Sequence, residues 1–153
     1  MSLTPRGRII GVGSPFGADC AGWRVIEYLQ TAGFPERFPR LDWQVLDRPG
    51  PGLIEWFTGM DLVVIVDAVL GGVPGQPRIL DVAALIDDGA GLSTHGFGVS
   101  EALAMAEALD DLPAHLVILA IEVGDGRHAV PHDYREIAGC LERLLEDYGF
   151  SPP

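Results

Sequence analysis

Two long apolar runs dominate the hydropathy pattern of the chain, LVVIVDAV (62–69) and HLVILAIEV (115–123). Neither run alternates apolar with polar positions, which is typical of strands whose two faces are both covered. Three shorter segments are predicted as further strands: RIIGVG (8–13), WQVLD (43–47) and RILDV (78–82), the last at an edge. The pattern therefore indicates a sheet with other structure packed on both faces.

Segments with helical periodicity lie between these strands. Residues 20–31 and 133–148 each place apolar side chains on one stripe, and residues 98–109 are rich in Ala, Leu, Met and Glu. Strands that alternate with helices predict an α/β fold with a largely parallel sheet and right-handed crossovers. The stripe of the first helix consists of Cys20, Trp23, Ile26 and Leu29, and that of the last helix of Ile137, Leu141, Leu144, Leu145 and Tyr148.

Length and charge narrow the classes of function. The 153 residues contain no repeat, linker or low-complexity tract, which predicts a single domain over 1–153. With 22 acidic and 10 basic residues, the formal net charge is −12. The basic residues are scattered, whereas binding to DNA, RNA or an anionic membrane requires them in a cluster. We therefore expect neither a nucleic acid nor a membrane as a partner.

The cysteines and the start of the chain bear on its location. Cys20 and Cys140 make neither a disulfide framework nor a CxxC metal pair. The first residues lack a secretory apolar core, and the longest apolar run is too short for a bilayer and contains an acid. These features predict a soluble, cytoplasmic protein.

Candidate functional residues follow the predicted strands, because sites in α/β sheets form beyond the carboxyl ends of the strands. Asp19 follows the first strand, Asp67 ends the third, and His95 lies just ahead of a helix. We expect these three side chains to converge at one edge of the sheet. Glu122 and Asp125, which follow the last strand, are further candidates.

Two carboxylates and an imidazole form a suitable ligand set for a divalent metal such as nickel, zinc, manganese or iron. Each residue also has a structural interpretation. Asp19 could cap the following helix, and His95 could be an ordinary loop histidine. Asp67 interrupts a β-branched run, where a buried carboxylate is costly unless it is paired or ligated. For Asp67 a functional role is therefore favoured.

The glycine-rich turn at 11–17 (GVGSPFG) raises a nucleotide-binding alternative. Its spacing is GxGxxxG instead of GxGxxG, Pro15 removes a backbone N–H, and Asp19 adds a negative charge where a phosphate would bind. Asp47 could imitate a ribose-binding acid, but the turn itself argues against a nucleotide. Cys20 could be a nucleophile at a helix start, although its place on the apolar stripe favours packing.

Four segments together resemble the hydrogenase maturation proteases, endopeptidases that trim the C-terminal extension from the large subunit of nickel–iron hydrogenases. IIGVGSPFGADCAGWRVIEYL is similar to the family's first strand, turn and first helix. DLVVIVDAVLGGVPGQPRIL is similar to its strand ending in Asp-Ala-Val, and STHGFGVSEALAMAEAL to its Ser-Ser-His-Gly helix start. VILAIEVGD is similar to its Ile-Glu strand end. The order and spacing of the four segments carry the resemblance over most of the chain.

The resemblance implies a three-layer α/β/α fold with a twisted, mostly parallel five-stranded sheet. It further implies that Asp19, Asp67 and His95 are both the metal ligands and the catalytic residues of an aspartyl-type, nickel-recognising endopeptidase. The nickel would arrive already installed in the hydrogenase large-subunit precursor, so that loading is checked before the tail is cut. A metal-polarised carbonyl, an activated water or a carboxylate acting as general base could then drive hydrolysis.

The first turn departs from the family pattern. Ser14 stands where the family usually has Asn, and Asp19 is a single acid where the family usually has two. Placing Asp19 at the ligand position requires a loop one residue shorter; without that gap Cys20 would occupy it, and a thiolate is also compatible with nickel. Two alternatives stay open: a peptidase-inactive metal-checkpoint or binding protein, and another α/β hydrolase such as a peptidyl-tRNA hydrolase, which the acidic charge disfavours.

Overall fold

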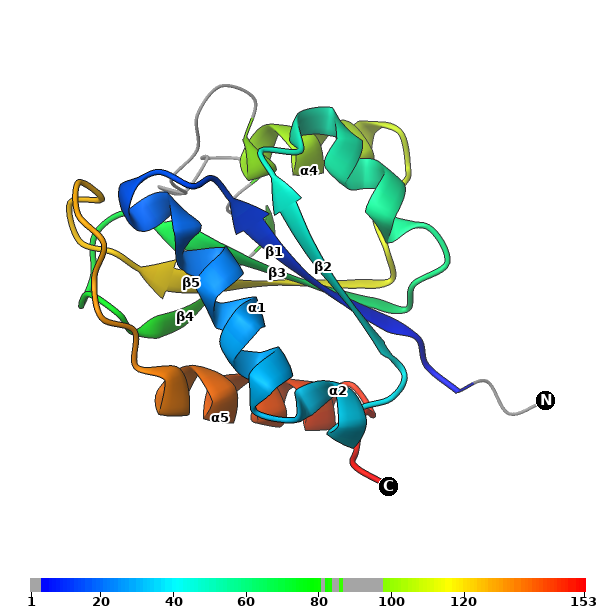
Figure 1. The fold of residues 1–153 in the computed structure, drawn as a ribbon. Coiled ribbons are helices and arrows are strands. Elements are labelled where there is room, and N and C mark those ends of the chain that lie inside the picture. Colours follow the sequence, from blue (N-terminus) through cyan, green and yellow to red (C-terminus); the bar gives the residue numbers. More distant parts are fainter. Residues whose placement is uncertain (1–3, 81, 84–85, 87–97) are drawn as a thin grey trace.

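The computed structural model describes residues 4–80, 82–83, 86 and 98–153, and its centre is a five-stranded sheet (Figure 1). The strands follow the order β2-β1-β3-β5-β4, and every neighbouring pair is parallel except β4 and β5. This confirms the predicted α/β fold with a mostly parallel sheet and a short edge strand. The strands are β1 (Gly7–Gly13), β2 (Leu41–Asp47), β3 (Leu62–Val69), β4 (Pro77–Leu80) and β5 (His115–Glu122).

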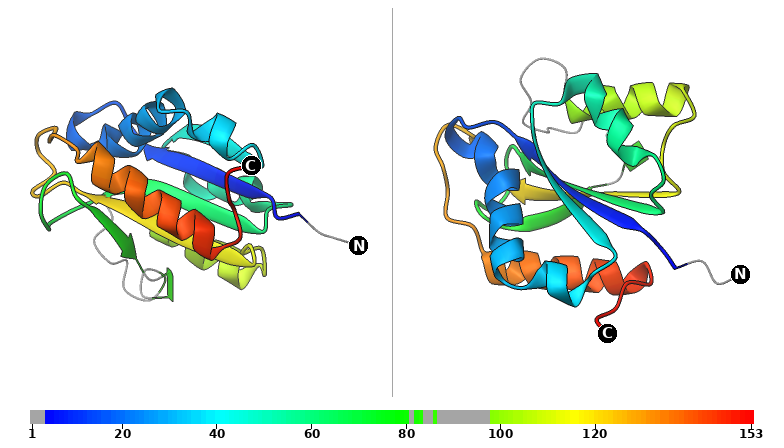
Figure 2. Two further views of the ribbon diagram at one scale, coloured as in Figure 1. Left: turned by 90° about the horizontal axis from the view of Figure 1, so that it is seen from below. Right: turned by 45° about the vertical axis from the view of Figure 1, so that its right-hand side comes forward.

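Helices cover both faces of the sheet, as the continuous apolar strands predict (Figures 1 and 2). On one face lie α1 (Ala21–Thr31), α2 (Phe34–Arg37) and α5 (Tyr134–Asp147). On the other lie the 3-10 helix η2 (Gly50–Phe57) and α4 (Val99–Ala108). Among the described residues, no helix combines the length and apolar character needed to cross a membrane.

Strand β3 contributes to both cores, which explains its unbroken apolar sequence. All eight of its residues are buried. Val64 and Val66 pack in the cluster beneath α1 and α5, whereas Val63 and Ile65 pack in the cluster beneath η2 and α4. Alternate side chains of a strand point to opposite faces, so a strand covered on both sides needs apolar residues at every position.

Helix α1 differs from its predicted form in where it begins and in which side chains it buries. A separate 3-10 helix, η1 (Gly17–Cys20), precedes it, so the stripe starts later than predicted. Cys20 and Trp23 are only partly buried, and Trp23 donates its indole N–H to the carbonyl of Leu46 at 3.0 Å. Of the predicted stripe, Ile26 and Leu29 are thus fully buried, whereas Cys20 lies in η1 and Trp23 lies at the margin of the core.

The start of α1 lies unusually close to the sheet because it carries a glycine. A Cβ atom on Gly22 would stand 2.6 Å from the carbonyl oxygen of Val12 and closer still to that of Val66. Only glycine permits this approach of a helix to the two strands β1 and β3. The turn before α1 is thereby held against the carboxyl ends of β1 and β3, where the candidate residues lie.

Candidate functional site

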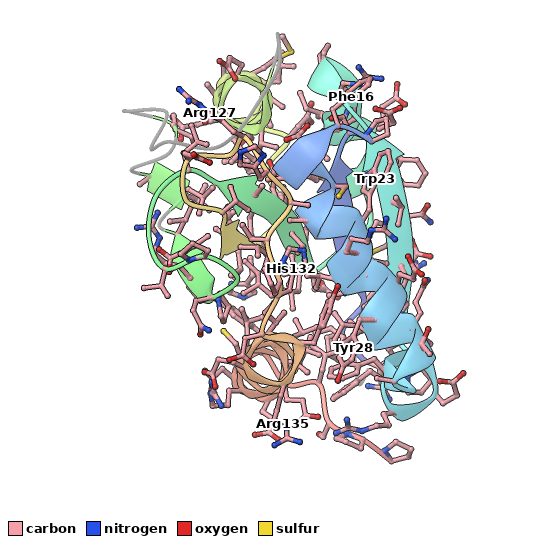
Figure 3. All side chains as sticks on the ribbon, turned by 60° about the vertical axis from the view of Figure 1, so that its left-hand side comes forward. Phe16, Trp23, Tyr28, Arg127, His132 and Arg135 are labelled. Atoms are coloured by element: carbon pink, nitrogen blue, oxygen red, sulfur yellow. The ribbon has the colours of Figure 1, made fainter. Side chains whose placement is uncertain are left out.

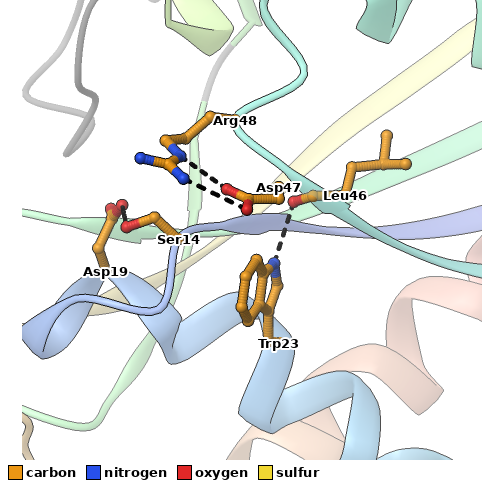
Figure 4. A network of polar contacts seen from close by, with 6 residues as sticks. All are labelled: Ser14, Asp19, Trp23, Leu46, Asp47 and Arg48. Atoms are coloured by element: carbon orange, nitrogen blue, oxygen red, sulfur yellow. Dashed lines mark hydrogen bonds and ion pairs between the residues drawn. The ribbon is translucent and has the colours of Figure 1, made fainter.

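The turn that follows β1 is closed by two hydrogen bonds between Ser14 and Asp19, of which Figure 4 shows the one between the side chains. The hydroxyl of Ser14 donates to Oδ2 of Asp19 at 2.5 Å, and the Ser14 N–H donates to the Asp19 carbonyl at 3.2 Å. Gly13 lies beneath this turn, and any Cβ there would collide with the Asp19 carbonyl. Ser14 is fully buried and Asp19 is 7% exposed. The turn thus holds the Asp19 carboxylate in a defined place at the carboxyl edge of the sheet.

Asp19 does not occupy the capping position of α1. The N-cap residue of that helix is Cys20, whose side chain makes no capping hydrogen bond. Instead, the Cys20 thiol donates to the carbonyl of Gly17 at 3.3 Å. The helix-cap interpretation of Asp19 is therefore wrong, because α1 begins one residue later than predicted, after the 3-10 helix that contains Asp19.

Asp67 is the most deeply buried acid among the described residues, with 1% of its surface exposed. One carboxylate oxygen, Oδ1, accepts the N–H of Ala68 at 2.8 Å. The other, Oδ2, has no hydrogen-bond partner in the part of the chain that the structure describes. Leaving a buried polar atom unpaired costs about 1–3 kcal/mol, so this oxygen is suited to bind a ligand.

Burial raises the pKa of Asp67 well above its ordinary value, the Ala68 N–H partly opposes this rise, and the negative charge of Asp19 adds to it. Asp19 lies in η1, which packs against β3, the strand that carries Asp67, and its charge acts on the pKa of Asp67. The structure therefore brings together two of the three predicted site residues. A bound cation would favour the ionised form of Asp67 and give its free oxygen a partner, so this donor pair fits a divalent metal.

The third predicted residue, His95, lies outside the described residues. Within those residues, no group of three or more His, Cys, Asp or Glu side chains is close enough to hold a metal ion. The described part of the site consists of the two carboxylates and the turn that carries Asp19.

Other acids at this edge have different surroundings. Asp47, the candidate ribose-binding acid, forms an ion pair with Arg48. Asp125 accepts the N–H of Arg127 at 3.0 Å and is exposed. The carboxylate of Glu122 lies in the space that a side chain on Gly72 would need. None of these three belongs to the buried pair.

Sequence reasoning missed two residues at the edge of the site, Phe16 and Arg48. Phe16 is 62% exposed on the turn between Ser14 and Asp19, and the guanidinium of Arg48 lies 5.6 Å from the centre of its ring. An exposed phenylalanine next to a buried carboxylate carries no sequence signal of its own. Arg48 directly follows a predicted strand, as the recognised candidates do, and that position could have identified it.

The fold and the site define an α/β protein with buried carboxylates at the carboxyl edge of a doubly covered sheet. The chain belongs to the hydrogenase maturation protease family, whose profile, HycI, matches residues 23–146. That range includes Asp67 but begins after the turn that holds Ser14 and Asp19. No curated protein sequence matches the chain significantly. The family match leaves no support for the peptidyl-tRNA hydrolase alternative.

Several solved structures share the fold over nearly the whole chain. The hydrogenase maturating endopeptidase HybD from E. coli is 17% identical with a TM-score of 0.71, and the alignment covers 95% of each chain. An endopeptidase from Escherichia coli is 20% identical with a TM-score of 0.74, over 96% of this chain and 97% of the other. The [NiFe] hydrogenase maturation protease HycI from Thermococcus kodakarensis KOD1 is 23% identical, with a TM-score of 0.56 over 94% and 90%. At these identities the likeness shows a shared fold.

Proposed function

We propose that this chain is an endopeptidase that removes the C-terminal extension of a nickel–iron hydrogenase large-subunit precursor. Its membership of the hydrogenase maturation protease family supports the reaction class. The observation that carries the proposal for this chain is the unpaired Oδ2 of Asp67, buried beside a second carboxylate at the carboxyl edge of the sheet. A buried carboxyl group without a partner is costly in a folded protein, and binding of a metal carried by the substrate would offset that cost.

In this proposal, Asp19 and Asp67 bind the nickel that the precursor already contains, with His95 as the third ligand. The Ser14 hydroxyl donates to Oδ2 of Asp19, so the carboxylate has a defined orientation before the substrate arrives. The nickel site of the precursor thereby aligns its C-terminal segment across the edge of the sheet. A precursor without nickel would lack this contact and would not be positioned for cleavage.

The hydrolysis itself requires a water molecule and a base close to the scissile bond. Asp67 is suited to move a proton, because burial raises its pKa and its carboxyl group therefore holds a proton at a higher pH than an exposed carboxyl does. A carboxylate whose pKa is raised by burial is a stronger base when ionised than an exposed one. The ligand role and the base role of Asp67 are separable by experiment, since a ligand affects binding and a base affects turnover.

The test uses purified precursor in nickel-loaded and nickel-free forms, with mass spectrometry to detect loss of the C-terminal extension. We expect the wild-type protein to cleave only the loaded form, and Asp67→Asn to abolish cleavage while the protein remains folded. Asp125→Asn is the matched control, because it removes the same charge from an exposed loop at the same edge of the sheet. Its activity should equal that of the wild type.

Two results would count against the proposal. Cleavage at full rate by the Asp67→Asn variant would refute the site assignment. Nickel-dependent binding of the precursor by the wild type without any cleavage would instead favour a peptidase-inactive metal-checkpoint protein of the same fold.

A further inference from the structure

Arg48 has a backbone conformation that arginine rarely adopts. Its φ angle is +42°, in the left-handed region, where a residue with a Cβ is less stable than glycine by about 1 kcal/mol or more. Among the described residues, Asp110 is the one other non-glycine residue with a positive φ, and aspartate tolerates that region better than most residue types. Glycine would fit position 48 without this cost.

The fold requires the conformation of this residue but not its side chain. The N–H of Arg48 donates to the carbonyl of Gly13 at 2.9 Å and so links the end of β2 to the end of β1. A backbone N–H is present in any residue other than proline, so this link does not depend on arginine. The side chain of Arg48 is 48% exposed and packs in neither hydrophobic core.

The guanidinium of Arg48 is nevertheless held in one orientation (Figure 4). Its Nε donates to Oδ1 of Asp47 at 2.7 Å and its Nη2 to Oδ2 at 3.3 Å. The ring of Phe16 lies against it, at 5.6 Å from ring centre to guanidinium carbon. Nη1 has no hydrogen-bond partner among the described residues, and it points away from Asp47. One edge of the guanidinium is thus fixed while the opposite end remains free to donate.

The guanidinium of Arg48 lies beside the turn that carries Asp19, because it contacts Phe16, the residue that precedes η1 on that turn. Asp47 raises the pKa of Arg48, first through its hydrogen bonds and then through its charge, and Asp19 adds a smaller effect in the same direction. The guanidinium is therefore within electrostatic range of Asp19. In a chain with net charge −12, a fixed positive group near Asp19 is a distinctive feature of this edge.

We propose that Arg48 is a substrate-binding residue whose free guanidinium end donates hydrogen bonds to oxygen atoms of the precursor segment that enters the site. This inference rests on the proposed function and deepens it. The acceptor is either a main-chain carbonyl or an acidic side chain of that segment. Because Asp47 and Phe16 already hold the guanidinium, little side-chain freedom is lost on binding. Phe16 offers an apolar surface next to it for a neighbouring substrate side chain.

The test compares Arg48→Gly and Arg48→Lys with the wild type in three measurements: precursor binding by calorimetry, kcat and KM for cleavage, and urea unfolding. Arg135→Ala is the control for charge, because this exposed arginine lies at the opposite end of the molecule from Phe16 (Figure 3). We expect Arg48→Gly to weaken precursor binding and raise KM about tenfold or more, with kcat little changed. Arg48→Lys should recover part of the loss.

Unfolding distinguishes a binding role from a structural one. Glycine relieves the backbone cost at position 48, so the urea midpoint of Arg48→Gly should equal or exceed that of the wild type. A lower midpoint together with unchanged KM would show that the arginine serves the fold and would overturn the inference. Loss of binding without loss of stability supports it.

The same data separate this inference from the proposed function. Cleavage by the wild type with unchanged KM in Arg48→Gly overturns the inference and leaves the function standing. Binding without cleavage by the wild type, lost in Arg48→Gly, overturns the endopeptidase and supports the inference. Failure of the wild type to bind and to cleave overturns both.

Precursor variants identify the acceptor oxygen. Each Asp and Glu of the precursor's C-terminal segment is replaced in turn by Asn or Gln. If one replacement weakens binding to the wild type but not to Arg48→Gly, the acceptor is that carboxylate. If every replacement leaves the effect of Arg48→Gly unchanged, the acceptor is a main-chain carbonyl. Both results agree with the proposal and differ only in the source of the oxygen.

Discussion

Ser14 and Asp19 bind each other through both side chain and main chain. The Ser14 hydroxyl donates to the Asp19 carboxylate at 2.5 Å, and the Ser14 N–H donates to the Asp19 carbonyl at 3.2 Å. Both residues are buried. The pair therefore closes the turn after β1 and fixes a carboxylate at the edge of the sheet at the same time.

Removing this hydroxyl should destabilise the protein. In Ser14→Ala, a buried carboxylate oxygen loses its donor, and we expect the free energy of unfolding in urea to fall by about 1–3 kcal/mol. Thr31→Ala is the control, because its hydroxyl makes an exposed bond to the carbonyl of Glu27 within α1. That variant should change stability by less than about 0.5 kcal/mol. An equal effect of both substitutions would contradict the role given to Ser14.

The buried carboxyl of Asp67 should lower stability as the pH rises. Because its pKa is raised in the folded state, the folded protein keeps a proton that the unfolded chain has lost. Unfolding then releases a proton, so stability falls from about pH 4 upward, by at most about 1.4 kcal/mol per pH unit, until the folded-state pKa is passed. Asp67→Asn removes this dependence and should be more stable than the wild type at pH 7.

Urea unfolding of the wild type and Asp67→Asn between pH 4 and pH 8 measures this difference. Asp125→Asn makes the same substitution at an exposed position and should follow the wild type. A constant offset between wild type and Asp67→Asn at every pH would show that Asp67 is ionised throughout, contrary to the raised pKa.

Gly22 should not tolerate a side chain. In Gly22→Ala, the new Cβ would meet the carbonyl oxygens of Val12 and Val66, which are main-chain atoms of two central strands. We expect a loss of about 3 kcal/mol and displacement of the turn that holds Asp19. Gly139→Ala in α5 is the matched control, since its Cβ would meet only the flexible end of Arg143 at 3.3 Å. That variant should gain about 0.5–1 kcal/mol in thermal or urea unfolding.

His132 should make the protein less stable in mild acid. Burial lowers the pKa of His132, and the positive charge of Arg24 lowers it further. The unfolded chain therefore takes up a proton at a higher pH than the folded one, and stability is lost as the pH falls below about 6.5. An NMR titration should place the pKa of His132 below 6.5. His132→Gln should weaken this pH dependence, and His128→Gln, at an exposed position in the same loop, should not.

The strands are largely predictable because each is a short continuous segment, and the apolar residues in it show that the segment is buried. All five predicted strands are present, with ends that differ by at most two residues. Asp67 is identifiable for the same reason, since an acid within a β-branched run stands out in the amino-acid sequence alone. The short helices η2 and α2 were not predicted, because their few turns and their prolines leave no clear helical period.

The sequence by itself thus determined the α/β class, the covering of both sheet faces and the presence of an acid within the apolar run of β3. The tertiary structure decided which groups meet: Ser14 with Asp19, and Arg48 with Phe16. It also decided that α1 begins at Ala21, directly after the 3-10 helix η1, and that the helix lies close to β1 and β3, which Gly22 permits. The hydrophobic period of a segment indicates which side chains of that helix or strand are buried. A site depends instead on distances between side chains of different elements, and these distances are set only when the elements pack.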